Sequence, residues 1–162
     1  MEQTILLVED DNNDRWFSTL AFEFIGLGCN LRFVPDGQEA IDYLGGIGKY
    51  RDRSQFPLPH LILLDMKLPK LSGMEVLKWI RAQPQFRSAI VIPLTSSAFQ
   101  EDIVAAHTAG ANDYLIKPLQ LAQWRALAQY IQSCWLPQSM HHMPAALPSQ
   151  VVHSVSRGEE AS

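Results

Sequence analysis

The chain has 162 residues, of which 47% are hydrophobic and 19% charged, which predicts one soluble globular domain with a full core and some additional tail. Its formal net charge of −4 argues against a nucleic-acid-binding surface, which is usually basic. No apolar run is long enough to span a bilayer and the first residues, 1–4, are acidic rather than basic, so we expect a cytoplasmic protein that binds neither nucleic acid nor membrane.

Short apolar runs alternate with amphipathic stretches along the first 136 residues. The apolar runs predict strands at 5–8, 31–34, 61–64, 89–94 and 113–116. The amphipathic stretches predict helices at 12–25, 39–44, 73–82, 101–109 and 119–136. This regular alternation favours a doubly wound α/β sandwich, in which right-handed crossovers build a five-stranded parallel sheet.

Three segments give more detailed expectations. One side of the first helix carries the side chains expected to face the core, which are Phe17, Leu20, Ala21 and Phe24. Residues 47–59 form a polar connection that is long for a link from helix to strand. Residues 137–162 are rich in Pro, Ser, His and Gln without a lasting period, so we expect a mostly unstructured C-terminal extension after a domain of residues 1–136.

Acidic residues follow two of the predicted strands. Glu9 and Asp10 come directly after the first strand, and Asp65 follows the four aliphatic residues of the third. Parallel strands present their carboxyl ends along one edge of the sheet, and with strand order 2-1-3-4-5 the first and third strands are neighbours there. These carboxylates should therefore share a pocket, where they repel each other unless a cation joins them. A few hard oxygen ligands suit Mg²⁺ better than Zn²⁺.

The same edge should receive Thr95 from the fourth strand and Lys117 from the fifth. Lys117 can pair with Asp65 at rest and with a phosphoryl oxygen later, while Thr95 offers its hydroxyl to a second oxygen. A carboxylate is already ionised, so Asp65 needs no general base to attack phosphorus in line. The arrangement predicts a Mg²⁺-dependent phosphoryl transfer to Asp65.

Four motifs resemble the receiver domains of two-component response regulators, over roughly residues 4–136. They are Leu7-Val8-Glu9-Asp10-Asp11, Leu64-Asp65-Met66-Lys67-Leu68-Pro69 with Ser72-Gly73 beyond, Leu94-Thr95-Ser96, and Tyr114-Leu115-Ile116-Lys117-Pro118. The resemblance implies a CheY-like, flavodoxin-like sandwich and a phosphorelay protein that accepts a phosphoryl group on Asp65 from a sensor histidine kinase. Glu9 and Asp10 would hold Mg²⁺ together with Asp65 and the backbone carbonyl of Lys67.

Further roles follow from the same resemblance. Thr95 and Lys117 match the family's switch hydroxyl and lysine, and Tyr114 matches the aromatic residue whose rotamer follows the threonine. Pro118 would follow a cis peptide bond. Such a protein is a signalling switch rather than an enzyme, because it catalyses only its own phosphorylation and slow dephosphorylation. Its output would be contact with other proteins.

A narrower likeness is to the single-domain regulators that serve phytochrome-type histidine kinases in cyanobacteria and other bacteria. The features that resemble this group are the long loop 46–53, the phrase Leu68-Pro69-Lys70 and a last helix that ends in Cys134-Trp135-Leu136. A phytochrome-type kinase is therefore a candidate partner.

Two surfaces allow more than one interpretation. In the last helix, Leu127, Tyr130 and Cys134 form an apolar strip beside the core-facing stripe, which is either an apolar margin or a homodimer contact. Trp16 stands beside the inward side of the first helix, where it is either partial core or part of a kinase-docking surface.

Two other classes of protein have either an Asp nucleophile or the same strand order as the one predicted here. A phosphohydrolase of the haloacid dehalogenase type also uses an Asp nucleophile, and it is the alternative function. It requires a second acid two positions later, where this chain has Lys67. A flavodoxin-type carrier would need phosphate-binding donors in its first loop. Glu9 and Asp10 would repel that phosphate, which excludes a flavin carrier.

Overall fold

The computed structural model describes residues 3–26 and 28–136 and shows one parallel sheet. Its strands lie in the order β2-β1-β3-β4-β5, as predicted. They are β1 (Gln3–Val8), β2 (Cys29–Val34), β3 (Leu61–Leu64), β4 (Ile90–Thr95) and β5 (Leu115–Ile116). All four residues of β3 are buried, because the strand lies between β1 and β4 and is covered on both faces.

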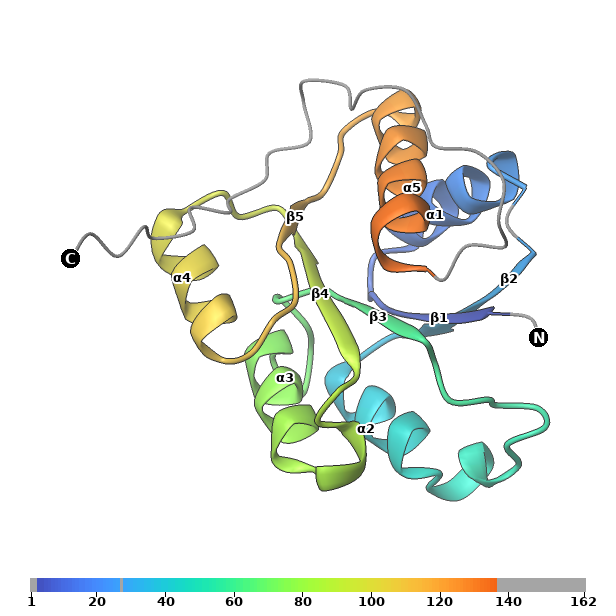
Figure 1. Ribbon diagram of the computed structural model, residues 1–162, viewed down its shortest axis with the longest axis vertical. Coiled ribbons are helices and arrows are strands. Elements are labelled where there is room, and N and C mark those ends of the chain that lie inside the picture. Colours follow the sequence, from blue (N-terminus) through green and yellow to red (C-terminus); the bar gives the residue numbers. More distant parts are fainter. Residues whose placement is uncertain (1–2, 27, 137–162) are drawn as a thin grey trace.

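Helices cover both faces of the sheet (Figure 1). They are α1 (Asn12–Phe24), α2 (Gly37–Gly45), α3 (Gly73–Ala82), α4 (Gln100–Thr108) and α5 (Leu121–Trp135), with short 3₁₀ turns η1 (Gly48–Arg51) and η2 (Pro84–Phe86). Helices α1 and α5 share one hydrophobic core with the sheet, and α2 and α3 share a second. The predicted α/β sandwich with five helices is confirmed. No helix of the described residues has the length and hydropathy needed to cross a membrane. The extension predicted for residues 137–162 lies outside the described part of the chain.

Side-chain caps set where the helices begin. Asp11 accepts hydrogen bonds from two backbone amides in the first turn of α1, and Asp36 accepts one from Glu39 in α2. Helix α3 begins with a capping box in which the Ser72 hydroxyl and the Glu75 carboxylate each accept the other's backbone N–H. Each of these three helices follows a loop that leaves the carboxyl edge of the sheet. The caps therefore also help to fix the backbone at that edge.

The inward face of α1 differs from the predicted face. Ala21 is buried as expected, but the buried aromatic residue is Phe22, at 3% exposure, whereas Phe24 is 59% exposed. Phe24 instead lies under the guanidinium group of Arg125 from α5, at 3.9 Å from the ring centroid. Trp16 is also exposed, so its interpretation as partial core is wrong.

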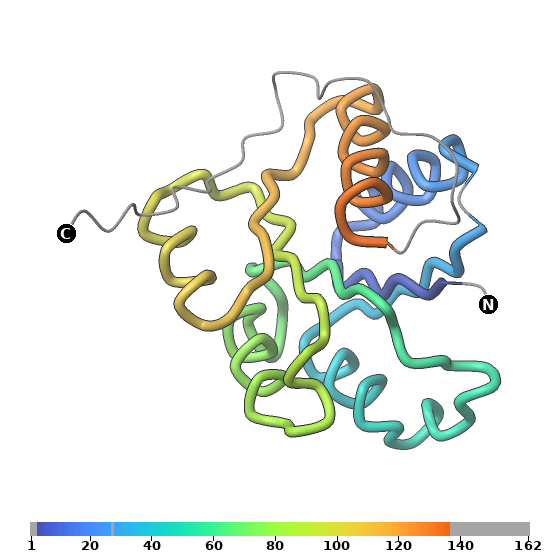
Figure 2. The backbone as a smooth tube through the Cα atoms, viewed as in Figure 1, coloured from blue at the N-terminus to red at the C-terminus, as the bar shows by residue number. Residues whose placement is uncertain are grey.

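The connection between α2 and β3 is an ordered part of the core rather than a purely polar loop. Figure 2 shows it extending to one side of the sheet next to α2. The rings of Tyr50 and Phe56 from this segment pack on Tyr43 of α2, with centroids 5.0 to 6.0 Å apart. The guanidinium of Arg53 donates to the carbonyl oxygens of Tyr43 and Leu44. It thereby supplies hydrogen-bond partners for carbonyl groups at the C-terminal end of α2.

The proposed dimer strip on α5 is not a surface strip. Leu127 and Tyr130 are buried in the core shared with α1, and only Cys134 is exposed. The hydroxyl of Tyr130 donates to the buried carboxylate of Asp113 at 2.6 Å, so this side chain is committed to an internal hydrogen bond. Leu127 and Tyr130 are therefore not available for the homodimer contact that was one of the two interpretations, because helix α5 uses a wider face for folding than its main stripe suggested.

Gly73 holds α3 against the loop that follows Asp65. A Cβ atom at this position would lie 2.3 Å from the carbonyl oxygen of Asp65 and 2.6 Å from the Cα of Met66. We expect Gly73→Ala to lower the free energy of unfolding by about 1–3 kcal/mol in urea denaturation, because the backbone must move to admit the methyl group. Gly28→Ala is the control, since nothing lies within 4 Å of a Cβ there. Equal stability of the two variants would contradict this packing.

Candidate functional site

The residues predicted for the site continue the hydrogen-bond ladders of the sheet by one position. The amide of Glu9 donates to the carbonyl of the last residue of β2 at 3.0 Å, and that of Asp65 donates to the last residue of β1 at 3.1 Å. The amide of Lys117 donates to the carbonyl of Thr95 at 2.8 Å. The backbone of the sheet therefore fixes all of these residues along its carboxyl edge.

Three carboxylates meet at this edge. Glu9 and Asp65 are buried and Asp10 is exposed, and each offers an oxygen within 4.8 Å of the others. A set of oxygen ligands with one member exposed to solvent fits a hard divalent cation that keeps some of its water. The predicted cluster of Glu9, Asp10 and Asp65 is thus assembled in the structure, and its chemistry suits Mg²⁺.

Lys117, directly after β5, contributes a positive charge to the pocket. Its ammonium nitrogen lies 2.6 Å from Glu9 Oε2, 2.8 Å from Asp65 Oδ2 and 3.0 Å from Asp14 Oδ2. Of these contacts, only the one with Asp65 was predicted from the sequence. Asp14 is a site residue that sequence reasoning missed, although its position in the acidic stretch that begins at Glu9 was visible.

Burial and charge act in opposite directions on this cluster. The pKa of Glu9 is raised to about 7, mainly by burial and also by the nearby charge of Asp65, although the hydrogen bonds from Lys117 and from the Asp11 backbone oppose the rise. Burial alone would lower the pKa of Lys117, but its hydrogen bonds to Asp65 and Glu9 outweigh this and hold that pKa well above the usual range. Lys117 therefore stays charged, and the pKa of Glu9 lies near neutral pH.

The loop after β3 orients the carboxylate of Asp65. The backbone amide of Lys67 donates to Asp65 Oδ1 at 3.0 Å, while Oδ2 faces Lys117. Lys67 has an exposed side chain and belongs to the loop beside the carboxylates. Its carbonyl as a metal ligand stays a prediction. The two oxygens of Asp65 thus accept hydrogen bonds from two different donors.

The predicted switch residues line a neighbouring cavity of about 210 Å³ between the loop after β3 and helix α4. Thr95 and Tyr114 are both buried there, and the Tyr114 hydroxyl donates to the backbone carbonyl of Ser97 at 2.9 Å. The Ser97 hydroxyl in turn donates to Asp102 of α4. Tyr114 is thereby linked to α4 through one residue.

The described residues contain no cis peptide bond, so the predicted cis bond before Pro118 is wrong.

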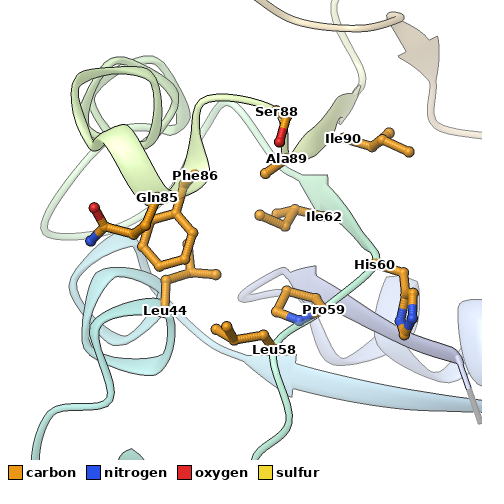
Figure 3. Close-up of a pocket in the computed structure, with 10 residues that line it drawn as sticks. All are labelled: Leu44, Leu58, Pro59, His60, Ile62, Gln85, Phe86, Ser88, Ala89 and Ile90. Carbon is orange, nitrogen blue, oxygen red and sulfur yellow. The ribbon is translucent and has the colours of Figure 1, made fainter.

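A second hollow, of about 270 Å³, lies at the opposite edge of the sheet (Figure 3). It is lined by apolar side chains such as Leu44, Ile62 and Phe86, with His60 at one side. The ring of His60 accepts a hydrogen bond from the amide of Thr4, at the beginning of β1. His60 precedes β3 and Asp65 follows it, so this hollow is separated from the carboxylates by the length of the strand.

The strand order and the carboxylate pocket define a doubly wound protein with its site at the switch point between β1 and β3. Residues 5–129 match the family model described as response regulator receiver domain. This match covers most of the chain, and the protein belongs to the response regulator receiver family.

Individual relatives resemble the chain over most of their length. The probable methanogenesis regulatory protein FilR2 of Methanothrix harundinacea is 35% identical over 141 residues, 87% of this chain and 88% of its own. Response regulator Rcp1 of Synechocystis sp. is 34% identical over 134 residues, 83% of this chain and 89% of its own. The structure of the phosphorylated cyanobacterial phytochrome response regulator RcpA superposes with a TM-score of 0.78 at 32% identity, covering 90% of this chain and all of that one. The chain is thus homologous to phytochrome response regulators.

Proposed function

We propose that this protein is a phosphoryl-accepting switch of a two-component system, with Asp65 as the acceptor. The observation that carries the proposal is the position of Asp65 at the carboxyl edge of the sheet, with Lys117 at 2.8 Å and two further carboxylates beside it. One Asp65 oxygen attacks phosphorus while the P–N bond of a phosphohistidine breaks, and the electron pair leaves with the imidazole. We infer a receiver domain of residues 1–136, because the family match ends at 129 and α5 ends at Trp135.

The residues around Asp65 have separate roles in this proposal. Glu9, Asp10 and Asp65, with the Lys67 carbonyl, hold Mg²⁺, which supplies positive charge for the oxygens of the phosphoryl group. The structure of Rcp1 in its Mn²⁺-bound form supports a divalent cation. Lys117 donates a hydrogen bond to one phosphoryl oxygen, and the hydroxyl of Thr95 donates a hydrogen bond to a different one. No proton has to be removed from the nucleophile.

The phosphoryl donor in this proposal is a sensor histidine kinase. Phytochrome-type kinases are the first to test, because RcpA is described as a phytochrome response regulator and its structure covers 90% of this chain. Trp16, exposed on α1, is available for contact with the kinase. The output is contact with another protein, and the link from Tyr114 through Ser97 to α4 gives that contact a dependence on the site.

Phosphoryl labelling tests the proposed function. With acetyl phosphate and Mg²⁺, intact-mass spectrometry should show one added phosphoryl group that is stable in acid and labile in base, and EDTA should prevent its addition. A panel of histidine kinases that includes phytochrome-type members should then transfer phosphate at unequal rates. No labelling by acetyl phosphate or by any kinase, in the presence of Mg²⁺, would overturn the proposal.

Binding of Mg²⁺ should depend on pH through Glu9. The metal needs the ionised carboxylate, and burial raises the pKa of Glu9 to about 7, so a proton competes with the metal below that pH. We expect the Mg²⁺ affinity at pH 6 to be about tenfold lower than at pH 8, as measured by tryptophan fluorescence titration. Glu9→Gln should bind more weakly but with little pH dependence. An equally steep pH dependence in this variant would assign the titration to another group.

A further inference from the structure

The ammonium group of Lys117 has three N–H donors and three carboxylate partners. Two partners, Glu9 and Asp65, belong to the group of oxygens that fits a metal ion. The third, Asp14, contacts Lys117 at 3.0 Å and is not a member of that group. Asp14 is therefore the one partner of this ammonium, among the described residues, that neither the metal nor the phosphoryl group would use.

Helix α1 holds Asp14 in a fixed place. Its backbone amide donates to the cap residue Asp11 at 2.9 Å, and its carbonyl accepts the hydroxyl of Ser18 at 2.6 Å. The carboxylate is 26% exposed and the Lys117 side chain 12%, so the ion pair is largely shielded from water. The pair joins the first turn of α1 to the end of β5, across 103 positions of the chain.

From this geometry we propose that Asp14 is a positioning residue for Lys117, an inference that rests on the proposed phosphoryl transfer. At rest three carboxylates share the ammonium. Glu9 and Asp65 would bind Mg²⁺, and Asp65 would then become an acyl phosphate, so two of the three attractions to the ammonium would weaken. Asp14 takes part in neither change and keeps its place in α1. It holds the ammonium beside the acceptor, while the N–H that pointed at Asp65 Oδ2 turns to a phosphoryl oxygen. Asp14 forms and breaks no covalent bond.

A structural role for Asp14 has different consequences. An acidic residue in the first turn stabilises a helix through the macrodipole whatever it contacts. Removing a carboxylate also reduces repulsion of an anionic phosphodonor, which by itself would speed labelling. Positioning requires the hydrogen-bond acceptor at residue 14 and the amine at residue 117 together, so variants can separate it from these effects.

The test is the rate constant for labelling by acetyl phosphate at saturating Mg²⁺. Asp14→Ala should lower it about tenfold, the loss typical of removing a group that orients a reacting or ligating side chain. Asp14→Asn should recover most of the rate, since its amide oxygen still accepts a hydrogen bond from Lys117. Asn13→Asp/Asp14→Ala keeps an acid in the first turn of α1 and should stay as slow as Asp14→Ala.

Two further measurements assign the effect to Lys117. In a Lys117→Ala background, adding Asp14→Ala should cost no additional rate, because the partner it positions is gone. The Mg²⁺ affinity of Asp14→Ala should change by less than about threefold, whereas Asp10→Asn should lose more than tenfold.

The inference is overturned if Asp14→Ala labels as fast as wild type, if the Asn and Ala variants are equally slow, or if the loss persists in the Lys117→Ala background. Failure of the wild-type protein to label would instead remove the proposed function itself.

Discussion

Asp65→Asn is expected to abolish phosphoryl labelling by both acetyl phosphate and histidine kinases. The amide has no ionised oxygen to attack phosphorus, yet it keeps the size of the side chain. Its oxygen can still accept a hydrogen bond from Lys117, so the pocket should keep its shape. Intact-mass spectrometry after incubation with the phosphodonor and Mg²⁺ should show only the unmodified mass.

The fold of this variant should not suffer. The charge of Asp65 is one cause of the raised pKa of Glu9, so removing that charge relieves repulsion inside the pocket. We expect a melting temperature at or above the wild-type value, which distinguishes a lost nucleophile from a lost fold. Asp42→Asn, which changes a partly exposed acid on α2, is the control and should label normally. Label that remains in Asp65→Asn and maps to Asp10 or Asp14 would place the acceptor elsewhere.

The sheet and the main contacts of the site were predictable because they depend on local features of the sequence. Four aliphatic residues before Asp65 can only form a buried strand, and a charge directly after them has to lie at its end. Lys117 follows another short strand by the same logic. Because parallel strands end on one edge, the order 2-1-3-4-5 was sufficient to bring the two side chains together.

Other features depend on how helices are rotated and docked. The choice of Phe22 over Phe24 as the buried side chain of α1 follows from packing against α5, and both fit a helical period. Tyr50 and Phe56 stand among charged residues without a period, so nothing local marks them as core. The contact of Asp14 with Lys117 requires the direction in which α1 leaves β1, which no spacing encodes.

Lys117→Ala is expected to slow phosphoryl labelling by about 10²–10³-fold, the range seen when one preorganised donor to a developing charge is removed. The ammonium lies 2.8 Å from Asp65 Oδ2 and no other cation contacts this oxygen among the described residues. Binding of Mg²⁺ should be retained or strengthened, since the metal and the ammonium compete for Glu9 and Asp65. The variant should therefore separate metal binding, followed by fluorescence, from transfer, followed by mass spectrometry.

The free energy of unfolding gives an independent measure of what the Lys117 ammonium contributes to the pocket. Without it, carboxylates of Glu9, Asp14 and Asp65 share a pocket that has lost its cation. The free energy of unfolding in EDTA should fall by about 3–5 kcal/mol, as when one partner of a buried ion pair is removed, and Mg²⁺ should restore much of it. Lys117→Met, which fills the same space without charge, should behave like the alanine variant. If Lys117→Met labels at the wild-type rate, the lysine only fills space, and charge stabilisation at this oxygen must come from the metal alone.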